Sequence, residues 1–473
     1  MEILRQFENG RFALLCLILI LSGFAFFAMF RVSSQATAEP PNPAEVKAVT
    51  KWLKDNAILL KSVEPGQSFD DLKPLKKVFK DVRIVGLGEA THGGHEFFRF
   101  KHRMVEFLIK EMGFKILAFE ASYPACLNIN DYVLSGKGER AKALASQGFW
   151  TWDTEEIADL LGWLYEYNRT QPEGKKAKFI GFDMQIYNHA YEKLEPFLKK
   201  AAPDYLAKAG PDFLPAKLAS NEFQQKSAEE KEKLKAQIKE LSDFLSLNQA
   251  RFTYSTSAQE FQIALRCSLI MAQFADMFSR PAFDQQNPAN GGVARRDFHM
   301  AENIKFIVNT EGSDSRVIVW AHDSHISSAN LGAKLPAMGS YLRQVYGPGY
   351  YALGATFGQG AFQSMNMDRD DQQKRGLTEF NLGPGDQGSV DWYFALPGLK
   401  NYLVDFRSSA KTPQITEWLN TSHMMRSIGS GFSTKWPWWQ YTEPTVLQKR
   451  FDGMVFIETT TRARPNAMKT SEK

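Results

Sequence analysis

Short runs of apolar, often β-branched residues recur along the chain, separated by longer segments in which apolar positions repeat with helical spacing. Runs of this kind are typical of buried strands, and the segments between them are typical of amphipathic helices. Seven runs predict strands: VRIVGLG (82–88), KILAFEA (115–121), AKFIGFD (177–183), RVIVWAH (316–322), YYALGATFG (350–358), NYLVDF (401–406) and FDGMVFIET (451–459). The alternation predicts an α/β fold, a layered sheet flanked by helices.

The middle of the chain shows a different pattern. Between residues 191 and 294 the strand runs disappear, and helical segments such as SAEEKEKLKAQIKELSDFL (227–245) take their place. We therefore predict one α/β domain over residues 45–190 and 295–460, interrupted by an all-helical insertion over 191–294. The charged residues of the insertion are expected to form a solvated helix face.

The N-terminus has the pattern of an export signal. Arg5 and Arg11 precede an apolar run over residues 12–30, and Ala-Thr-Ala follows at 36–38. The run is close to the length that spans a bilayer, and the small residues fit a signal-peptide cleavage site. We expect residues 1–38 to be a signal peptide with its linker, or alternatively a membrane anchor. In both cases the rest of the chain is exported, either periplasmic or secreted, or held at the cytoplasmic membrane.

Charge and cysteine content exclude two classes of protein. The chain has 473 residues, with 57 Lys and Arg against 53 Asp and Glu, a net charge of +4. No basic tract accompanies this small excess, so we expect no nucleic-acid partner. Cys16 lies in the N-terminal apolar run, and Cys126 and Cys267 lie in helix-like segments without a CxxC motif. We expect two buried thiols and no disulfide framework.

The segment GEATHGGHEFFRFKHRMVEFLIKEM (88–112) holds an ionisable residue where an apolar one is expected. On a helix over about 94–112, Lys101 falls at the centre of the apolar stripe, whereas His95 and His102 fall on the polar side. We expect both histidines to be solvated. Burying an unpaired ammonium is costly, so Lys101 should pair with a carboxylate or extend to the rim.

Further ionisable residues share one position, at or just beyond the end of a predicted strand. In open α/β sheets, ligands collect beyond the carboxyl ends of the strands, and titratable groups gather at functional sites. Together with Lys101, the predicted site therefore contains Glu89, His92, Glu120, His322 and His325.

Three other residues have plainer interpretations. Asp183 follows a predicted strand and either orients a site histidine or is solvated. In ARRDFHMAENI, Arg296 is expected at the surface and Asp297 as an acidic residue in the first turn of a helix. The pair Gly93-Gly94 predicts a tight turn into the helix, since neither a Walker motif nor GxGxxG spacing is present.

Three kinds of function fit the predicted site. The first is metal-independent ester hydrolysis, in which a neutral imidazole takes a proton from water; no GxSxG motif indicates a serine nucleophile. The second is a metal-dependent hydrolase or protease, because histidines and glutamates are ligands for zinc or manganese, although no HExxH motif is present. The third is an exported protein that binds a small ligand. We expect no cofactor, with a divalent metal as the alternative.

Six segments, taken in order, resemble the erythromycin esterase family. They are GEATHGGHEFFRFKHRMVEFLIKEMGF, LAFEA, FWTWDTEEIADLLGWLYEYN, FIGFDMQ, RDFHMAENI and WAHDSHI. The resemblance implies hydrolysis of the macrolactone ester of macrolide antibiotics by a histidine that activates water, and through it a role in antibiotic resistance. The partner implied is a small-molecule ester or lactone.

The motifs assign the family's functional positions residue by residue. The water-activating histidine corresponds to His92, with Glu89 beside it. The basic residue of the following helix corresponds to Lys101, where some relatives have arginine, the strand-end glutamate to Glu120, and the paired histidines to His322 and His325. The export segment is a departure from the cytoplasmic resistance enzymes, because the ribosomal target of macrolides is cytoplasmic. Residues 359–450, which include STKWPWWQYTEP, match no motif of the family.

Overall fold

The computed structural model describes residues 40–209, 220–312, 314–331, 335–368 and 376–466. The predicted export segment, residues 1–38, lies outside these ranges. No helix within them is long and apolar enough to cross a membrane.

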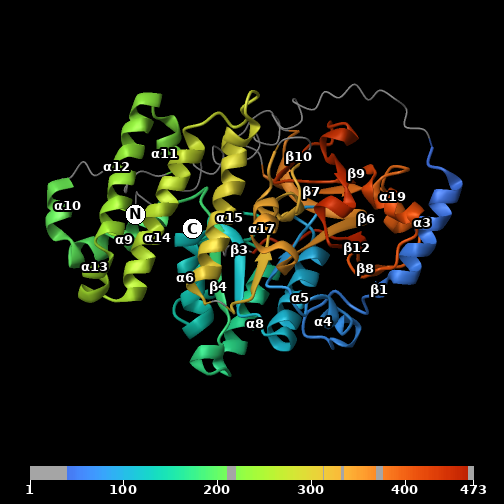
Figure 1. Ribbon diagram of the computed structural model, residues 1–473, viewed down its shortest axis with the longest axis horizontal. Coiled ribbons are helices and arrows are strands. Elements are labelled where there is room, and N and C mark those ends of the chain that lie inside the picture. The colour runs from blue at the N-terminus through green and yellow to red at the C-terminus, as the bar shows by residue number, and fades with distance from the viewer. Residues whose placement is uncertain (1–39, 210–219, 313, 332–334, 369–375, 467–473) are drawn as a thin grey trace, which may run out of the picture.

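A mixed sheet of ten strands forms the centre of the molecule (Figure 1). Eight strands follow one another in the order β1-β8-β12-β6-β2-β5-β3-β4, and β7 and β10 pair with β6. The strands from β12 to β4 run parallel, whereas β1, β7 and β8 pair in the antiparallel sense. Their bounds are β1 Ile58–Leu59, β2 Ile84–Leu87, β3 Ile116–Ser122, β4 Lys178–Asp183, β5 Val317–Trp320, β6 Tyr350–Asn366, β7 Leu377–Leu382, β8 Asn401–Asp405, β10 Gly431–Phe432 and β12 Gly453–Thr460.

All seven predicted strands are present, and the α/β prediction is confirmed. The central strands are apolar on both faces because both are covered, so successive residues enter different cores. Ile116 and Ala118 of β3 pack into one core, and Leu117 and Phe119 pack into the other. The pattern was less informative in the C-terminal part, where β7, β10 and the separate pair β9 (Ser422–Arg426) and β11 (Thr442–Val446) were not predicted.

Helices cover the two faces of the sheet. One core contains side chains from α4 (Leu75–Val78), α5 (His95–Met112), α6 (Tyr123–Ser135), α7 (Arg140–Ala145) and α8 (Glu155–Arg169). The other contains side chains from α3 (Pro43–Asn56), α15 (Gly292–Thr310), α16 (Asp323–Ile326), α17 (Met338–Tyr346), α18 (Val390–Ala395), α19 (Pro413–Asn420) and α20 (Leu447–Arg450).

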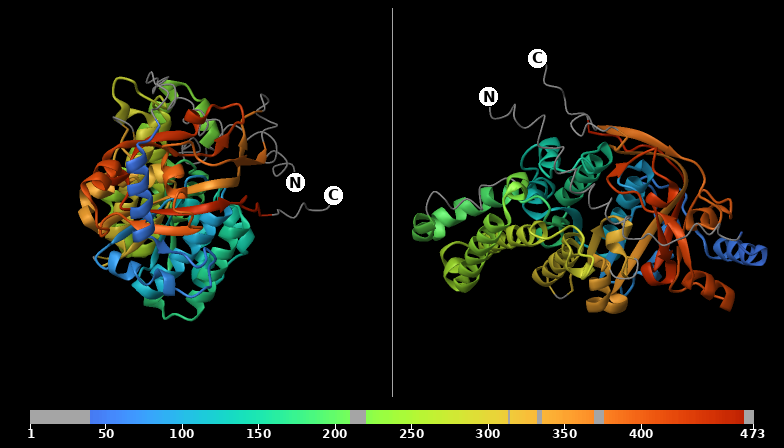
Figure 2. Two further views of the ribbon diagram at one scale, coloured as in Figure 1. Left: turned by 90° about the vertical axis from the view of Figure 1, so that its right-hand side faces the viewer. Right: turned by 90° about the horizontal axis from the view of Figure 1, so that it is seen from above.

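Within the described residues, the chain between β4 and α15 forms only α-helices and one short 3-10 turn. Figure 2 shows this helical bundle projecting from the end of the sheet nearest β4. The bundle comprises α9 (Asn188–Ala201), α10 (Pro203–Ala209), α11 (Ser220–Gln225), α12 (Ala228–Leu247), α13 (Gln249–Ser255) and α14 (Ala258–Phe278). The all-helical insertion is therefore present, while the division of the chain into domains stays a prediction.

Candidate active site

Three neighbouring strands bring the predicted site residues together. β5 lies between β2 and β3, and Leu87, Trp320 and Phe119 occupy one line of the register across them. Residues one or two positions beyond that line must share the carboxyl edge of the sheet. Glu120 and His322 do so, and the main-chain N–H of His322 donates to Glu120 Oε2 at 2.9 Å.

Glu89 is the centre of the first set of contacts. Its carboxylate is buried and accepts from His92 Nδ1 and from Lys101 Nζ, each at 2.8 Å and each on a different oxygen. The Lys101 ammonium also donates to the carbonyl of Ala321 and lies 4.4 Å from the ring centre of Trp320. Burial lowers the pKa of Lys101, although Glu89 opposes that change. We call Glu89, His92 and Lys101 the Glu89 group.

His92 keeps one ring nitrogen available. Because the Glu89 carboxylate accepts at Nδ1, the proton is held there and the lone pair is on Nε2. Among the described residues, no hydrogen bond is made to Nε2. The imidazole is 12% exposed and packs edge-on to Trp152 at 5.3 Å and against His322 at 4.9 Å between ring centres. The geometry fixes the tautomer in which Nε2 can accept a proton.

A second set of contacts surrounds Glu120. Its Oε1 accepts from Arg296 Nη2 at 2.7 Å and lies 3.3 Å from His325 Nε2. The same guanidinium donates to Asp183 Oδ2 at 2.8 Å. Burial alone would raise the pKa of Glu120, but the charges of His325 and Arg296 hold it well below its ordinary value. With Asp297, which bonds His325, these residues form the Glu120 group.

His325 has both ring nitrogens in contact with charged partners. Nδ1 lies 3.0 Å from Asp297 Oδ1, and Nε2 lies 2.7 Å from Arg296 Nη1. Burial opposes protonation of His325, but Asp297 and Glu120 raise its pKa overall. Since the guanidinium can only donate, the 2.7 Å contact requires an imidazole with no proton on Nε2.

His322 is held by main-chain and hydroxyl groups. Its Nδ1 caps α16 by accepting from the N–H of Ser324 at 3.2 Å, and its Nε2 lies 3.2 Å from the carbonyl of Ile428. Burial, followed by the neighbouring His92 and His325, lowers the pKa of His322 well below its ordinary value. His322 is therefore a neutral packing partner of His92 rather than a free base.

The expectation that His95 and His102 are solvated is wrong. His95 Nδ1 lies 2.5 Å from Glu156 Oε1, and His102 is buried against Trp163 at 6.0 Å between ring centres. Burial lowers the pKa of His102 to about 3. The polar side of α5 is covered by α8 and by residues 60–72, which supply carboxylate partners for its charged side chains. One of them is Asp159, which accepts from Arg99 at 2.9 Å.

The expectations for Arg296 and Asp297 are also wrong. Arg296 is buried between Glu120 and Asp183, and Asp297 accepts from Met338 N at 2.7 Å in addition to holding His325. Asp183 is buried and not solvated, and it contacts Arg296 rather than a histidine. The helical spacing contained this signal, because Arg296 and Asp297 lie one turn before Met300 and Ala301 on the buried side of α15.

The loop between β2 and α5 is fixed by two distant segments. A Cβ atom on Gly93 would lie 1.9 Å from the carbonyl oxygen of Gln363 in β6, so only glycine fits there. Gly93 also accepts from the N–H of Ala463 at 2.8 Å, and Thr461 accepts from the N–H of His95 at 2.9 Å. The predicted turn at Gly93-Gly94 is present, and residues 461–466 form a strap across it.

No group of three or more His, Cys, Asp and Glu side chains within the described ranges is arranged to hold a metal ion. Instead, His92 contacts the Glu89 carboxylate, His322 contacts a main-chain carbonyl and His325 contacts the Arg296 guanidinium.

Comparison with known proteins decides the family. The model described as erythromycin esterase matches residues 109–460, most of the chain. The chain belongs to the erythromycin esterase family. The matched range includes the Glu120 group, together with His322, and begins after the loop that carries Glu89 and His92. Membership implies a hydrolase that acts on a small molecule.

Similar proteins align along nearly their whole length. Erythromycin esterase type II of Escherichia coli is 25% identical over 429 residues, 86% of this chain and 97% of that protein. A Bacillus cereus protein of known crystal structure is 29% identical, with a TM-score of 0.79 over 90% of this chain and 100% of the other. A mutant of the erythromycin esterase EreC in its open conformation has a TM-score of 0.64 at 16% identity, over 86% and 98% of the two chains. At that identity the EreC comparison shows the fold alone.

Proposed function

We propose that this member of the erythromycin esterase family cleaves an ester or lactone by attack of a water molecule that His92 activates, without a metal. One observation carries the proposal: Lys101, Glu89 and His92 form a continuous chain of 2.8 Å contacts that ends at an unbonded ring nitrogen. A base of this kind needs a free lone pair, a fixed tautomer and a partner for its charge, and all three are present.

The proposed reaction begins when Nε2 of His92 removes a proton from water and the oxygen attacks the ester carbonyl carbon. Glu89 stabilises the resulting imidazolium, and Lys101 holds Glu89 in place. The tetrahedral intermediate then expels the alkoxide, which takes the proton back from Nε2. The products are a carboxylic acid and an alcohol, and His92 returns to its starting form.

We assign stabilisation of the negative tetrahedral oxygen to Arg296. Lys101 is buried beneath Glu89, and both ring nitrogens of His322 are engaged, so neither offers a free donor. Glu120 would repel an oxyanion. The Arg296 side chain is 11% exposed, and its Nη1, which donates one N–H to His325, carries a second N–H that can donate to an oxyanion. Glu120, Lys101, His322 and His325 are thus positioning residues.

The substrate class follows from the chemistry and from the relatives. The Escherichia coli relative is named an erythromycin esterase, which supports an ester bond, including that of a macrolactone, as the target. A metal-dependent hydrolase or protease that uses the same site, and an exported protein that binds a small ligand, are the competing hypotheses.

Turnover of a panel of esters, lactones and amides by the purified full chain tests the proposal. We expect an ester or lactone to be hydrolysed, with turnover lost in His92→Ala and unaffected by a chelator. Loss of turnover on chelation and its recovery with zinc would identify a metallohydrolase. Binding of panel members with no turnover would identify a binding protein.

We also propose that the chain is exported. Support comes from the apolar run over residues 12–30 and the Ala-Thr-Ala that follows it. Fractionation of cells that produce the full chain should place the folded part outside the cytoplasm, and N-terminal sequencing distinguishes a cleaved signal from a retained anchor. Recovery of the uncleaved chain from the cytoplasm would contradict export.

A further inference from the structure

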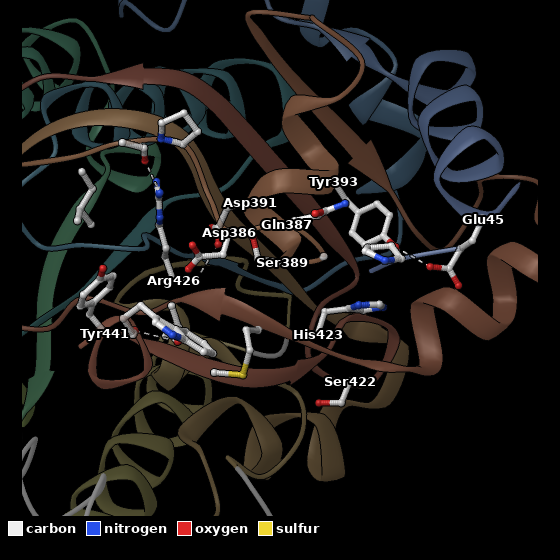
Figure 3. A pocket seen from close by; sticks show the side chains of 18 residues that line it. Glu45, Asp386, Gln387, Ser389, Asp391, Tyr393, Ser422, His423, Arg426 and Tyr441 are labelled. Carbon is white, nitrogen blue, oxygen red and sulfur yellow. Dashed lines mark hydrogen bonds between the residues drawn. The ribbon is translucent and has the colours of Figure 1, made fainter. Parts of the chain in front are cut away.

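A cavity lies in the C-terminal part of the molecule, and its lining includes no residue of the Glu89 group. It has a volume of about 570 Å³, within the range of small-molecule sites. Its wall combines α3, the loop that follows β7, strand β9 and the segment around β11, and Figure 3 shows Glu45 at one end and Tyr441 at the other. The proposed hydrolysis uses none of these residues.

Trp438 places an exposed indole ring on the cavity wall. It is 45% exposed, and its neighbour Trp439 is 47% exposed, in the otherwise unexplained segment STKWPWWQYTEP. Only Trp438 lines the cavity. An exposed indole on a cavity wall offers a flat face on which an apolar surface can stack, and Trp438 provides one.

The polar groups beside Trp438 have unused hydrogen-bonding capacity. No hydrogen bond among the described residues engages the Asp386 carboxylate, the Gln387 amide, the Tyr441 hydroxyl or the Trp438 indole N–H. The carboxylate accepts hydrogen bonds and the indole N–H donates one. The amide and the hydroxyl can each do both. A ligand that matches this wall must therefore carry hydroxyl-like groups, each able to donate and accept.

The charges of the cavity exclude anions. Arg426 is the one cation in the lining, and its Nη1 donates to the carbonyls of Phe357 and Gly358 at 3.2 and 3.0 Å. Its Nη2 donates to the carbonyl of Gly383. With the guanidinium occupied, the carboxylates of Asp386 and Glu45 determine the potential felt by a ligand. Phosphate and carboxylate ligands are disfavoured.

We propose that this cavity binds a neutral saccharide unit, with one face of the sugar ring on Trp438 and its hydroxyls on Asp386, Gln387 and Tyr441. A pyranose has an apolar C–H face and a rim of hydroxyls, which is the combination that the wall offers. An organic cation would satisfy the carboxylates but leave the indole and amide donors without acceptors. The inference goes beyond the proposed hydrolysis and does not depend on it.

Isothermal titration of the purified full chain with methyl glycosides of glucose, galactose, mannose and N-acetylglucosamine tests the proposal. We expect saturable binding of at least one glycoside, weakened about tenfold or more by Trp438→Ala and by Asp386→Asn. Trp439→Ala is the matched control, because this equally exposed indole lies outside the cavity, and it should leave the affinity unchanged. His92→Ala should also bind normally, whatever its turnover.

Three results would overturn the proposal: no binding of any glycoside, an equal loss in the Trp439 variant, or binding of choline in place of the sugars. Thermal unfolding of each variant shows whether its fold is intact. If Trp438→Ala does not fold, Trp438→Phe and Gln387→Ala replace it, and unchanged affinity in both contradicts the assignment.

Discussion

The Glu89 group and the Glu120 group contain the same kinds of residue and differ in one respect. Each has a buried glutamate at or just beyond the carboxyl end of a strand, a cation bonded to it and a histidine at its edge. In the Glu89 group the histidine makes one charged contact and keeps Nε2 unbonded. In the Glu120 group both nitrogens of His325 are engaged, by Asp297 and Arg296. Residue type and strand-end position therefore do not identify a base; the number of remaining lone pairs does.

The largest effect should come from removing the free nitrogen. General-base catalysis contributes about 10²–10⁴-fold, so His92→Ala should lower kcat by about that factor while the fold persists. Steady-state kinetics on a hydrolysed ester and circular dichroism measure the two quantities. His189→Ala, a histidine on α9 that lies beside Glu192, is the matched control. A fully active His92→Ala enzyme would place the base elsewhere.

Loss of the Arg296 cation should lower stability in addition to turnover. Arg296→Met leaves Glu120 and Asp183 buried without their partner, and breaking a buried pair costs about 3–5 kcal/mol. We expect the free energy of unfolding to fall by that amount in chemical denaturation. Arg296→Lys restores the charge but not three donors in one plane, so it should recover part of the loss. Equal stability of the two variants would show that charge alone matters.

Lys101 tests the role of the Glu89 group, because its ammonium holds the carboxylate that in turn bonds His92. Lys101→Met leaves Glu89 with His92 alone as its partner, and activity should fall by about tenfold, less than in the His92 variant but more than in Lys101→Arg. Arginine keeps the charge beside the Glu89 carboxylate. Measuring kcat and KM for both variants separates a positioning role, which lowers kcat, from weakened substrate binding. Unchanged kcat in Lys101→Met would remove Lys101 from the proposal.

The smallest effect concerns His102, a histidine with no chemical role. Its pKa is about 3 in the folded chain and about 6.5 when unfolded, so the unfolded chain binds the proton first. The neutral, buried imidazole therefore contributes fully to the free energy of unfolding above pH 6.5. This contribution is lost as the pH falls toward 3, at up to about 1.4 kcal/mol per pH unit. His102→Phe should flatten this part of the stability curve, measured by denaturation between pH 7 and 4. Identical slopes would contradict the burial of a neutral imidazole.

The sequence predicted the strands well because their signal is local. A strand with both faces covered is apolar throughout, and seven such runs stood out. Which strands are neighbours is not local information. That β5 lies between β2 and β3, and so brings His322 beside Glu120, follows only from the folded register.

Polar side chains were harder to place than apolar ones. Helical spacing correctly marked Lys101 as buried, because its neighbours on the stripe are apolar. The same spacing placed His95 and His102 in solvent, since a polar face packed against polar partners has the pattern of a solvated one. Arg296 was assigned to the surface for a similar reason, as its partners Glu120 and Asp183 lie far away in the sequence.

Strand β12 is synthesised after every other strand of the sheet, yet it occupies a place between β6 and β8. The strap that follows it holds Gly93 and the N–H of His95, and thereby the loop that carries His92. A growing chain that has emerged only as far as β11 therefore has a gap in its sheet and an unsupported loop. We expect a chain cut before residue 453 to lack both the strand and the strap, and so to hold His92 in no fixed position even where the rest has folded.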